Sequence, residues 1–208
     1  YGQAPIDDDP YGAPEDAYPY PYPAEDGGGR GGSGALPIIG FILLGVLAGT
    51  SQGYAAALYY TITYVIMSVG GFGMIILLSR KGFEADSLEA FKGLDARTAW
   101  FAAMMRMLMF SMAGVPPFVG FWAKLAVIQA VLDIGSLWLA ILAVALSVVG
   151  AYYYLRVVKL MYFDEPTDKA ALQAGGATRF VLSLNGLAVL ALGLYPGLLL
   201  ALCARVIP

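Results

Sequence analysis

Apolar residues occur in five long blocks after residue 35, separated by short polar segments. A helix needs about 20 apolar residues to cross the hydrocarbon core of a bilayer. The second block, Tyr54 to Leu78, has 25 residues without a charge, so it predicts a transmembrane helix. The first block, Leu36 to Gly49, has only 14 residues and is interpreted as the second half of a span. The fourth block, Leu137 to Phe163, is also long enough to cross.

The fifth block, Phe180 to Ala204, contains two residues that are uncommon inside helices, Asn185 and Pro196. Both are tolerable within a transmembrane helix when neighbouring helices satisfy the freed polar groups. We therefore predict one further span here.

The third block, Thr98 to Leu132, is the unusual one, because its 35 residues are too many for one span and too few for two. A straight helix of that length would extend about 50 Å, whereas two spans would need about 40 residues plus a turn. Near its middle the block contains Gly114, Pro116 and Pro117. A proline pair removes two backbone donors and interrupts a helix. Such a break must face protein or water, since hydrocarbon cannot satisfy the freed carbonyls.

The distribution of basic residues between loops indicates how often the third block crosses, since lysine and arginine accumulate on the cytoplasmic side. One crossing places nine basic residues on one side and Arg205 alone on the other, whereas two crossings give six against four. The stronger bias favours one crossing. The nine are Arg30, Arg80, Lys81, Lys92, Arg97, Arg156, Lys159, Lys169 and Arg179.

The third block is thus predicted to be a discontinuous helix with halves from about Ala99 to Ala113 and from about Phe118 to Leu132. With this topology the amino-terminal tail is cytoplasmic and the carboxyl terminus is periplasmic. The predicted fold is all-α, a polytopic transmembrane bundle of about four full spans plus one half-length span.

Composition agrees with a membrane protein, since 59% of the 208 residues are apolar and 13% are charged, against about a quarter charged in a soluble domain. The tail, residues 1–35, holds seven acids and one arginine, interleaves proline with tyrosine and ends in glycines. It is predicted to be disordered, because it cannot bury enough apolar surface to offset the entropy of ordering. Residues 36–208 form the predicted membrane domain.

The chain contains no histidine and one cysteine, Cys203. This excludes a Cys/His zinc site, an iron–sulfur cluster, histidine-ligated haem and a Ser-His-Asp triad. We expect no metal site, no redox-active residue and no bound cofactor in this chain. No phosphate-binding motif follows a strand, so neither nucleotide nor nucleic-acid binding is expected.

Lys124 is the main candidate for function. It lies seven residues after Pro117 and eight before Leu132, which is too deep for its side chain to reach the interface easily. A charged group at such a depth normally marks an ion or proton pathway. Arg106 is the other internal charge, but arginine does not release its proton. It is interpreted as a snorkelling residue, as a residue paired with an acid or with an outside partner, or as a modulator of Lys124. Asp133, a lone acid, is expected at the interface, with a proton-exit role as the alternative.

The sequence resembles the carboxyl-terminal part of subunit N of proton-pumping NADH-quinone oxidoreductase, respiratory complex I, in its bacterial form. The resemblance rests on five runs that cover most of residues 40 to 166: GFILLGVLAGT, YYTITYVIMSVGGFGMIILLSRKGFE, FKGL, MFSMAGVPPFVGFWAKLAV and GAYYYLRVVKLMYFDEP. It implies an antiporter-like membrane subunit of two inverted repeats, each with a broken helix. Lys124 matches the functional lysine of the second broken helix, and Pro116 and Pro117 match its break.

The resemblance further implies a multi-pass protein of the bacterial plasma membrane, with the other membrane subunits of complex I and the lipid bilayer as partners. NADH, FMN, iron–sulfur clusters and quinone are expected in partner subunits. Only about four and a half helices are matched, so a truncated or frameshifted chain start is expected. Arg106 stands where the family has an apolar residue.

Two alternatives stay open. The chain can belong to a related cation/proton antiporter or membrane hydrogenase, whose core would be nearly identical. It can also be a membrane fragment that transports nothing, because it lacks the partner repeat.

Overall fold

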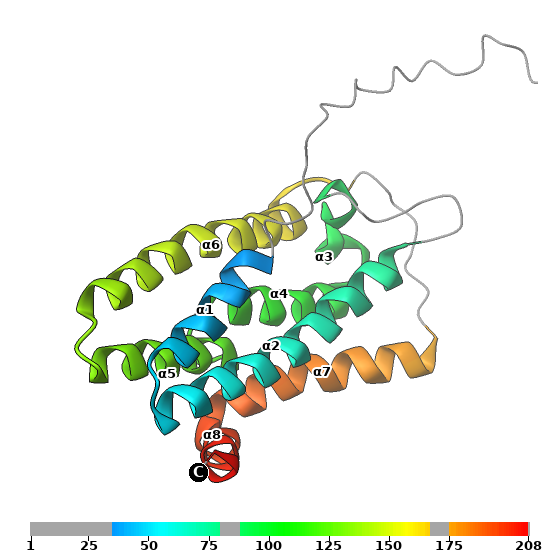
Figure 1. The fold of residues 1–208 in the computed structure, drawn as a ribbon. Coiled ribbons are helices and arrows are strands. Elements are labelled where there is room, and N and C mark those ends of the chain that lie inside the picture. Colours follow the sequence, from blue (N-terminus) through cyan, green and yellow to red (C-terminus); the bar gives the residue numbers. More distant parts are fainter. Residues whose placement is uncertain (1–34, 80–87, 167–174, 208) are drawn as a thin grey trace, which may run out of the picture. The chain divides into compact units, whose positions relative to one another are not determined.

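The structure, a computed structural model, describes residues 35–79, 88–166 and 175–207 (Figure 1). They belong to one compact unit, Ser33–Pro208. The tail that is predicted to be disordered, residues 1–35, lies almost wholly outside the described residues. Its disorder therefore stays a prediction. The described part is helical: α1 (Ala35–Leu47), α2 (Ser51–Leu78), the short 3₁₀ helix η1 (Leu88–Phe91), α3 (Leu94–Arg97), α4 (Ala99–Ala113), α5 (Val119–Asp133), α6 (Leu137–Phe163), α7 (Gly176–Leu194) and α8 (Pro196–Val206).

The predicted polytopic helical fold is confirmed. Among the described residues, α2, α6 and α7 are each long and apolar enough to cross a membrane, and α1, α4 and α8 are shorter apolar helices. The third apolar block is discontinuous, as predicted, with α4 ending at Ala113 and α5 beginning at Val119.

The block also runs once through the bundle. Helix α6 starts just after α5, and Leu160 near its end accepts a hydrogen bond of 3.0 Å from Gly93, which precedes α4. Helix α6 therefore returns along the combined length of α4 and α5 (Figure 1). This arrangement is the one that loop charge predicts.

Helix α7 lies antiparallel to α2 and parallel to α4. A Cβ atom added to Gly73 would meet Leu182, and one added to Gly186 would meet the Met104 sulfur. These small residues allow close helix packing, which is typical of membrane proteins. The start of α7 is therefore at the same end of the bundle as the start of α4.

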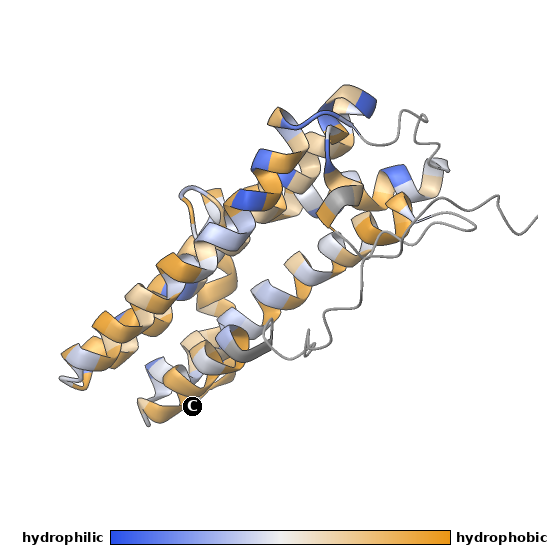
Figure 2. Cartoon of the chain, turned by 90° about the horizontal axis from the view of Figure 1, so that it is seen from above, coloured by the Kyte–Doolittle hydropathy of each residue, from blue (hydrophilic) through white to orange (hydrophobic). Residues whose placement is uncertain are grey.

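Basic residues of the described part gather at that end: Lys92, Arg97, Lys159 and Arg179 lie in or next to the 3₁₀ helix, α3, the end of α6 and the start of α7. Figure 2 shows most of the strongly hydrophilic positions toward this end and long apolar stretches elsewhere. We call it the cationic end of the bundle.

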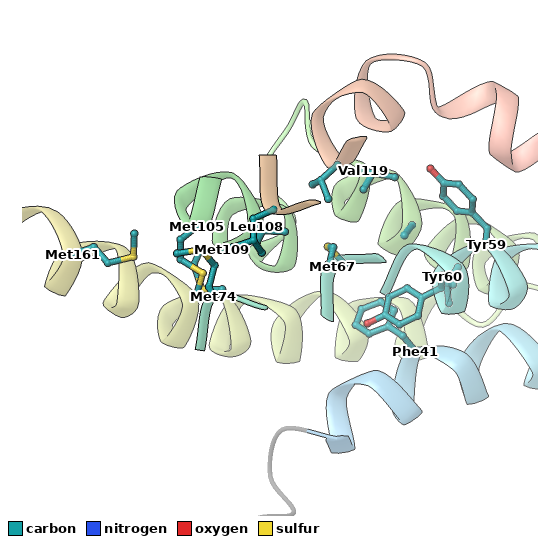
Figure 3. Close-up of a cluster of buried hydrophobic side chains, with 14 of the residues drawn as sticks. Phe41, Tyr59, Tyr60, Met67, Met74, Met105, Leu108, Met109, Val119 and Met161 are labelled. Carbon is teal, nitrogen blue, oxygen red and sulfur yellow. The ribbon is translucent and has the colours of Figure 1, made fainter. Parts of the chain in front are cut away.

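Helix α2 is the centre of the packing and contacts α1, α4, α5, α7 and α8. The buried side chains form one cluster that joins α1 and α2 to α4, α5 and α6 (Figure 3). Phe41 of α1 stacks on Tyr60 of α2 with ring centroids 5.2 Å apart. At the other end of the cluster, Met161 of α6 is fully buried.

The last apolar block differs from its prediction as one uninterrupted span. Helix α7 ends at Leu194, Tyr195 has a non-helical backbone (φ −124°, ψ 60°), and α8 begins with Pro196. Proline disfavours a helical conformation in the residue before it and lacks the donor that would continue the helix. The chain therefore turns at Tyr195, and α8 is seen nearly end-on where α7 lies across the view (Figure 1).

Candidate functional site: a lysine at the break of a discontinuous helix

Lys124 lies in the second turn of α5 and is partly buried. Its ammonium group donates three hydrogen bonds: to the Met112 carbonyl (2.9 Å), the Ala113 carbonyl (3.0 Å) and the Ser147 hydroxyl of α6 (2.9 Å). Met112 and Ala113 are the last two residues of α4, and carbonyls in the last turn of a helix have no partner within it. The lysine therefore supplies the donors that the helix break removes.

The position also suits the charge of Lys124. Partial negative charge accumulates at the carboxyl-terminal end of a helix, which stabilises a nearby cation. Among the residues that the structure describes, no carboxylate contacts the Lys124 ammonium group. Main-chain carbonyls of α4 and one hydroxyl group thus take the place of an acidic partner.

The local sequence explains why α4 ends where it does. Gly114 has a left-handed backbone (φ 89°, ψ 34°), and its N–H bonds to the Phe110 and Ser111 carbonyls. Only glycine adopts this conformation without steric cost. A Cβ atom at Gly114 would also lie 3.2 Å from the Lys124 ammonium nitrogen. Position 114 therefore both ends α4 and leaves room for the lysine.

A second glycine holds the two half-helices together. A Cβ atom at Gly120 would overlap the Ser111 carbonyl, and the Gly120 N–H donates to the Ser111 hydroxyl over 3.0 Å. Ser111 is fully buried in α4. This contact brings the first turn of α5 onto the end of α4 and places Lys124 within reach of the freed carbonyls.

The remaining predicted residues of the break lie on the surface of the described chain. Pro116 and Pro117 are exposed, and the peptide bond between them is cis. Gly193 of α7 packs against the main chain of Pro117 and Phe118, where a Cβ atom would not fit. Helix α7 therefore supports the break from the side.

A cavity of about 670 Å³ opens beside Lys124, between α1, α2, α5 and α6. Its walls are mainly apolar and aromatic, and Lys124 and Ser147 are among its lining residues. The Lys124 nitrogen is 6.0 Å from the centroid of the Phe41 ring. The tyrosines that line the cavity are Tyr60, Tyr64, Tyr153 and Tyr154. The site thus combines one ammonium group with hydroxyl groups around a space large enough for several water molecules.

The structure does not bring the two predicted modulators to Lys124. Arg106 is exposed on α4, with its guanidinium carbon 5.2 Å from the Tyr162 ring centroid. Asp133 is the exposed last residue of α5, nine residues beyond Lys124 and so about 13 Å along the helix. Neither is a hydrogen-bond partner of the lysine.

Sequence reasoning included Ser147 only among the polar groups that could line a hydrated path. It did not single out Ser147 or Phe41 as partners of Lys124. Ser147 is the single hydroxyl residue in the apolar first half of α6, a signal that could have drawn attention to it. Asn185 links helices instead, because its side chain donates to the Ile66 carbonyl over 2.9 Å.

The fold and the site together define a class of protein. It is a polytopic helical membrane protein with one discontinuous helix, and a lysine of the second half-helix lies at the break between the two halves. The family model described as NADH:quinone oxidoreductase/Mrp antiporter, TM, matches residues 36–150. The chain belongs to this family, as its sequence resemblance implies.

The relatives that it matches include NADH-quinone oxidoreductase subunit N of Thioalkalivibrio sulfidiphilus, which is 60% identical over 169 residues, covering 81% of this chain and 35% of that protein. The chain thus spans about a third of the length of the curated relatives it matches.

Among solved structures, a chain of respiratory complex I from Thermus thermophilus with bound aureothin is 27% identical, with a TM-score of 0.65 over 77% of this chain and 36% of that chain. A chain of the Mrp complex from Dietzia sp. DQ12-45-1b shares the fold, with 24% identity and a TM-score of 0.64 over 80% of this chain and 39% of that one.

Proposed function

We propose that this chain is part of a proton-translocating membrane subunit of a bacterial NADH-quinone oxidoreductase. The observation that carries the proposal is the position of Lys124: its ammonium group bridges the break of a discontinuous helix and faces a cavity with hydroxyl-bearing walls. A lysine can bind and release a proton, whereas the neighbouring carbonyls cannot. Lys124 would therefore act as the relay, and Gly114, Pro116 and Pro117 would form the break that holds it.

In this proposal the chain contributes to a translocase and performs no redox chemistry. NADH, FMN, iron–sulfur clusters and quinone would bind to partner subunits, and other membrane subunits of the complex would contact its outer surface. The cationic end of the bundle would face the cytoplasm of the bacterial plasma membrane, because basic residues accumulate on that side. The amino-terminal tail would then be cytoplasmic and the carboxyl terminus periplasmic.

The second candidate function is cation/proton exchange without NADH oxidation. It is favoured by the family description, which includes Mrp antiporters, and by the fold shared with the Mrp complex.

An assay in sealed vesicles separates the two functions. The assembly is purified through a tag on the full chain, reconstituted, and supplied with NADH and a quinone. We expect internal pH to change on NADH addition, in buffers with or without sodium, and to collapse with an uncoupler. A pH change that requires a sodium gradient and occurs without NADH would instead identify the antiporter.

Replacement of Ser147 by alanine is expected to slow proton transport by roughly threefold to tenfold, because the Lys124 ammonium loses its hydrogen bond to the Ser147 hydroxyl. The rate is measured as NADH-driven pH change per NADH oxidised. Ser136→Ala is the matched control, since Ser136 precedes the same helix and its side chain does not cap it. Equal rates in the two variants would exclude a contribution of Ser147.

A further inference from the structure

Arg106 has no role in the lysine site, yet it is a permanent charge on an apolar helix. It is exposed on α4, and it contacts the Tyr162 ring, whose centroid is 5.2 Å from the guanidinium carbon. Within residues 35–79, 88–166 and 175–207, no carboxylate forms an ion pair with it. An arginine in a membrane span is costly unless it reaches the interface or a counter-charge.

The helix directs this side chain toward the cationic end. Side chains in a helix lean toward its amino terminus, and the amino terminus of α4 is at that end. The residues one and two turns before Arg106 on the same face are Ala103 and Ala99. Because both are small, the arginine stem can extend over them without obstruction.

The contact with Tyr162 places the guanidinium group beside the last turn of α6, at the cationic end. Helix α6 ends at Phe163, so Tyr162 is its second-to-last residue. Trp100, in the first turn of α4, is also partly exposed, and its indole donates to the Ser183 hydroxyl over 2.8 Å. Tryptophan and tyrosine at such positions are typical of the boundary between hydrocarbon and headgroups.

Charges of both signs lie around Tyr162. Lys159, exposed on α6, is three residues before Tyr162 and so adjacent to it on the helix surface. Asp95 of α3 is the nearby acid that also interacts electrostatically with Tyr162. The acids after α6, Asp164 and Glu165, belong to the loop that places Pro166 against Gly93, beyond the last turn. Arg106, Lys159 and the Tyr162 ring therefore share one surface of the described chain at the cationic end.

We propose that Arg106, Tyr162 and Lys159 bind the phosphate group of an anionic phospholipid at the cationic end of the bundle. A guanidinium group forms two parallel hydrogen bonds with phosphate oxygens. The lysine adds a second positive charge, and the exposed apolar face of α6 below Tyr162 contacts the acyl chains. Charge complementarity selects an anionic headgroup over a zwitterionic one.

The test uses the full protein, purified with its assembly and placed in nanodiscs of phosphatidylcholine containing increasing phosphatidylglycerol. Native mass spectrometry measures how much phosphatidylglycerol stays bound. Arg106→Gln is expected to weaken its binding about fivefold, as for one basic residue at an anionic surface. Arg106→Lys is expected to have a smaller effect, because it keeps the charge and loses only the paired geometry.

Arg205→Gln is the matched control, since Arg205 is an exposed arginine in the last turn of α8, away from this surface. It is expected to bind phosphatidylglycerol like the unsubstituted protein. Equal retention by Arg106→Gln and Arg205→Gln would overturn the proposal, and so would a carboxylate of a neighbouring chain placed against Arg106 in a structure of the assembly. The measurement involves no transport, so its outcome is independent of the proposed function.

Discussion

Replacement of Lys124 by alanine is expected to reduce proton transport by about a hundredfold or more, the usual effect of removing a group that transfers protons. The variant removes the titratable cation that the described residues contribute to the cavity wall. It also leaves the Met112 and Ala113 carbonyls without the donors that satisfy them. The measurement is NADH-driven pH change in sealed vesicles, normalised to NADH oxidation and to the amount of assembled protein.

Two further variants separate proton transfer from structural support. Lys124→Arg keeps a donor and a positive charge but cannot release its proton at physiological pH, so it should assemble and fail to transport. Lys124→Gln keeps a neutral donor for the carbonyls and should also assemble without transporting. Arg205→Gln, in the last turn of α8, is the control for loss of an exposed cation. Normal transport by an assembled Lys124→Gln variant would rule out the relay.

Replacement of Gly120 by alanine is expected to lower the free energy of unfolding by about 1–3 kcal/mol, the range for an overpacked core. The added Cβ atom would overlap the Ser111 carbonyl, so the ends of α4 and α5 must move apart. This would also displace Lys124 from the α4 carbonyls, and transport should fall. The thermal midpoint of the purified assembly measures the first effect.

Gly71→Ala is the matched control for this substitution. Gly71 is also within a membrane helix, but a Cβ atom there would meet nothing within 4 Å. Alanine is the better helix former by about 1 kcal/mol, so this variant should be as stable as the original or more so. If the two alanine variants had the same midpoint, the close contact at Gly120 would not exist in the protein.

The discontinuous helix could be predicted because two independent patterns agree on it. The length of the block and its central Gly114 and Pro116–Pro117 place the break, and the distribution of basic residues requires a single crossing. The structure ends α4 at Ala113, the residue predicted, and begins α5 at Val119, one residue later than predicted.

The partners of Lys124 could not be predicted in the same way. Ser147 and Phe41 reach the site from α6 and α1, so their contacts depend on how separate helices pack, which no local pattern encodes. The turn at Tyr195 was missed for a different reason. Pro196 is compatible both with a kinked single span and with a new helix, and sequence alone does not decide between them.

Of the three groups in the described chain that accept a hydrogen bond from Lys124, two belong to the main chain, and this affects how the site tolerates mutation. Any residue at positions 112 and 113 that keeps α4 helical offers the same carbonyls to the ammonium group. At positions 114 and 120, by contrast, the site depends on the absence of a side chain. Saturation mutagenesis should therefore find Met112 variable among apolar residues, the buried Ala113 variable among small ones, and the two glycines nearly fixed. In this protein the positions that have no functional group of their own are as informative about the site as the lysine itself.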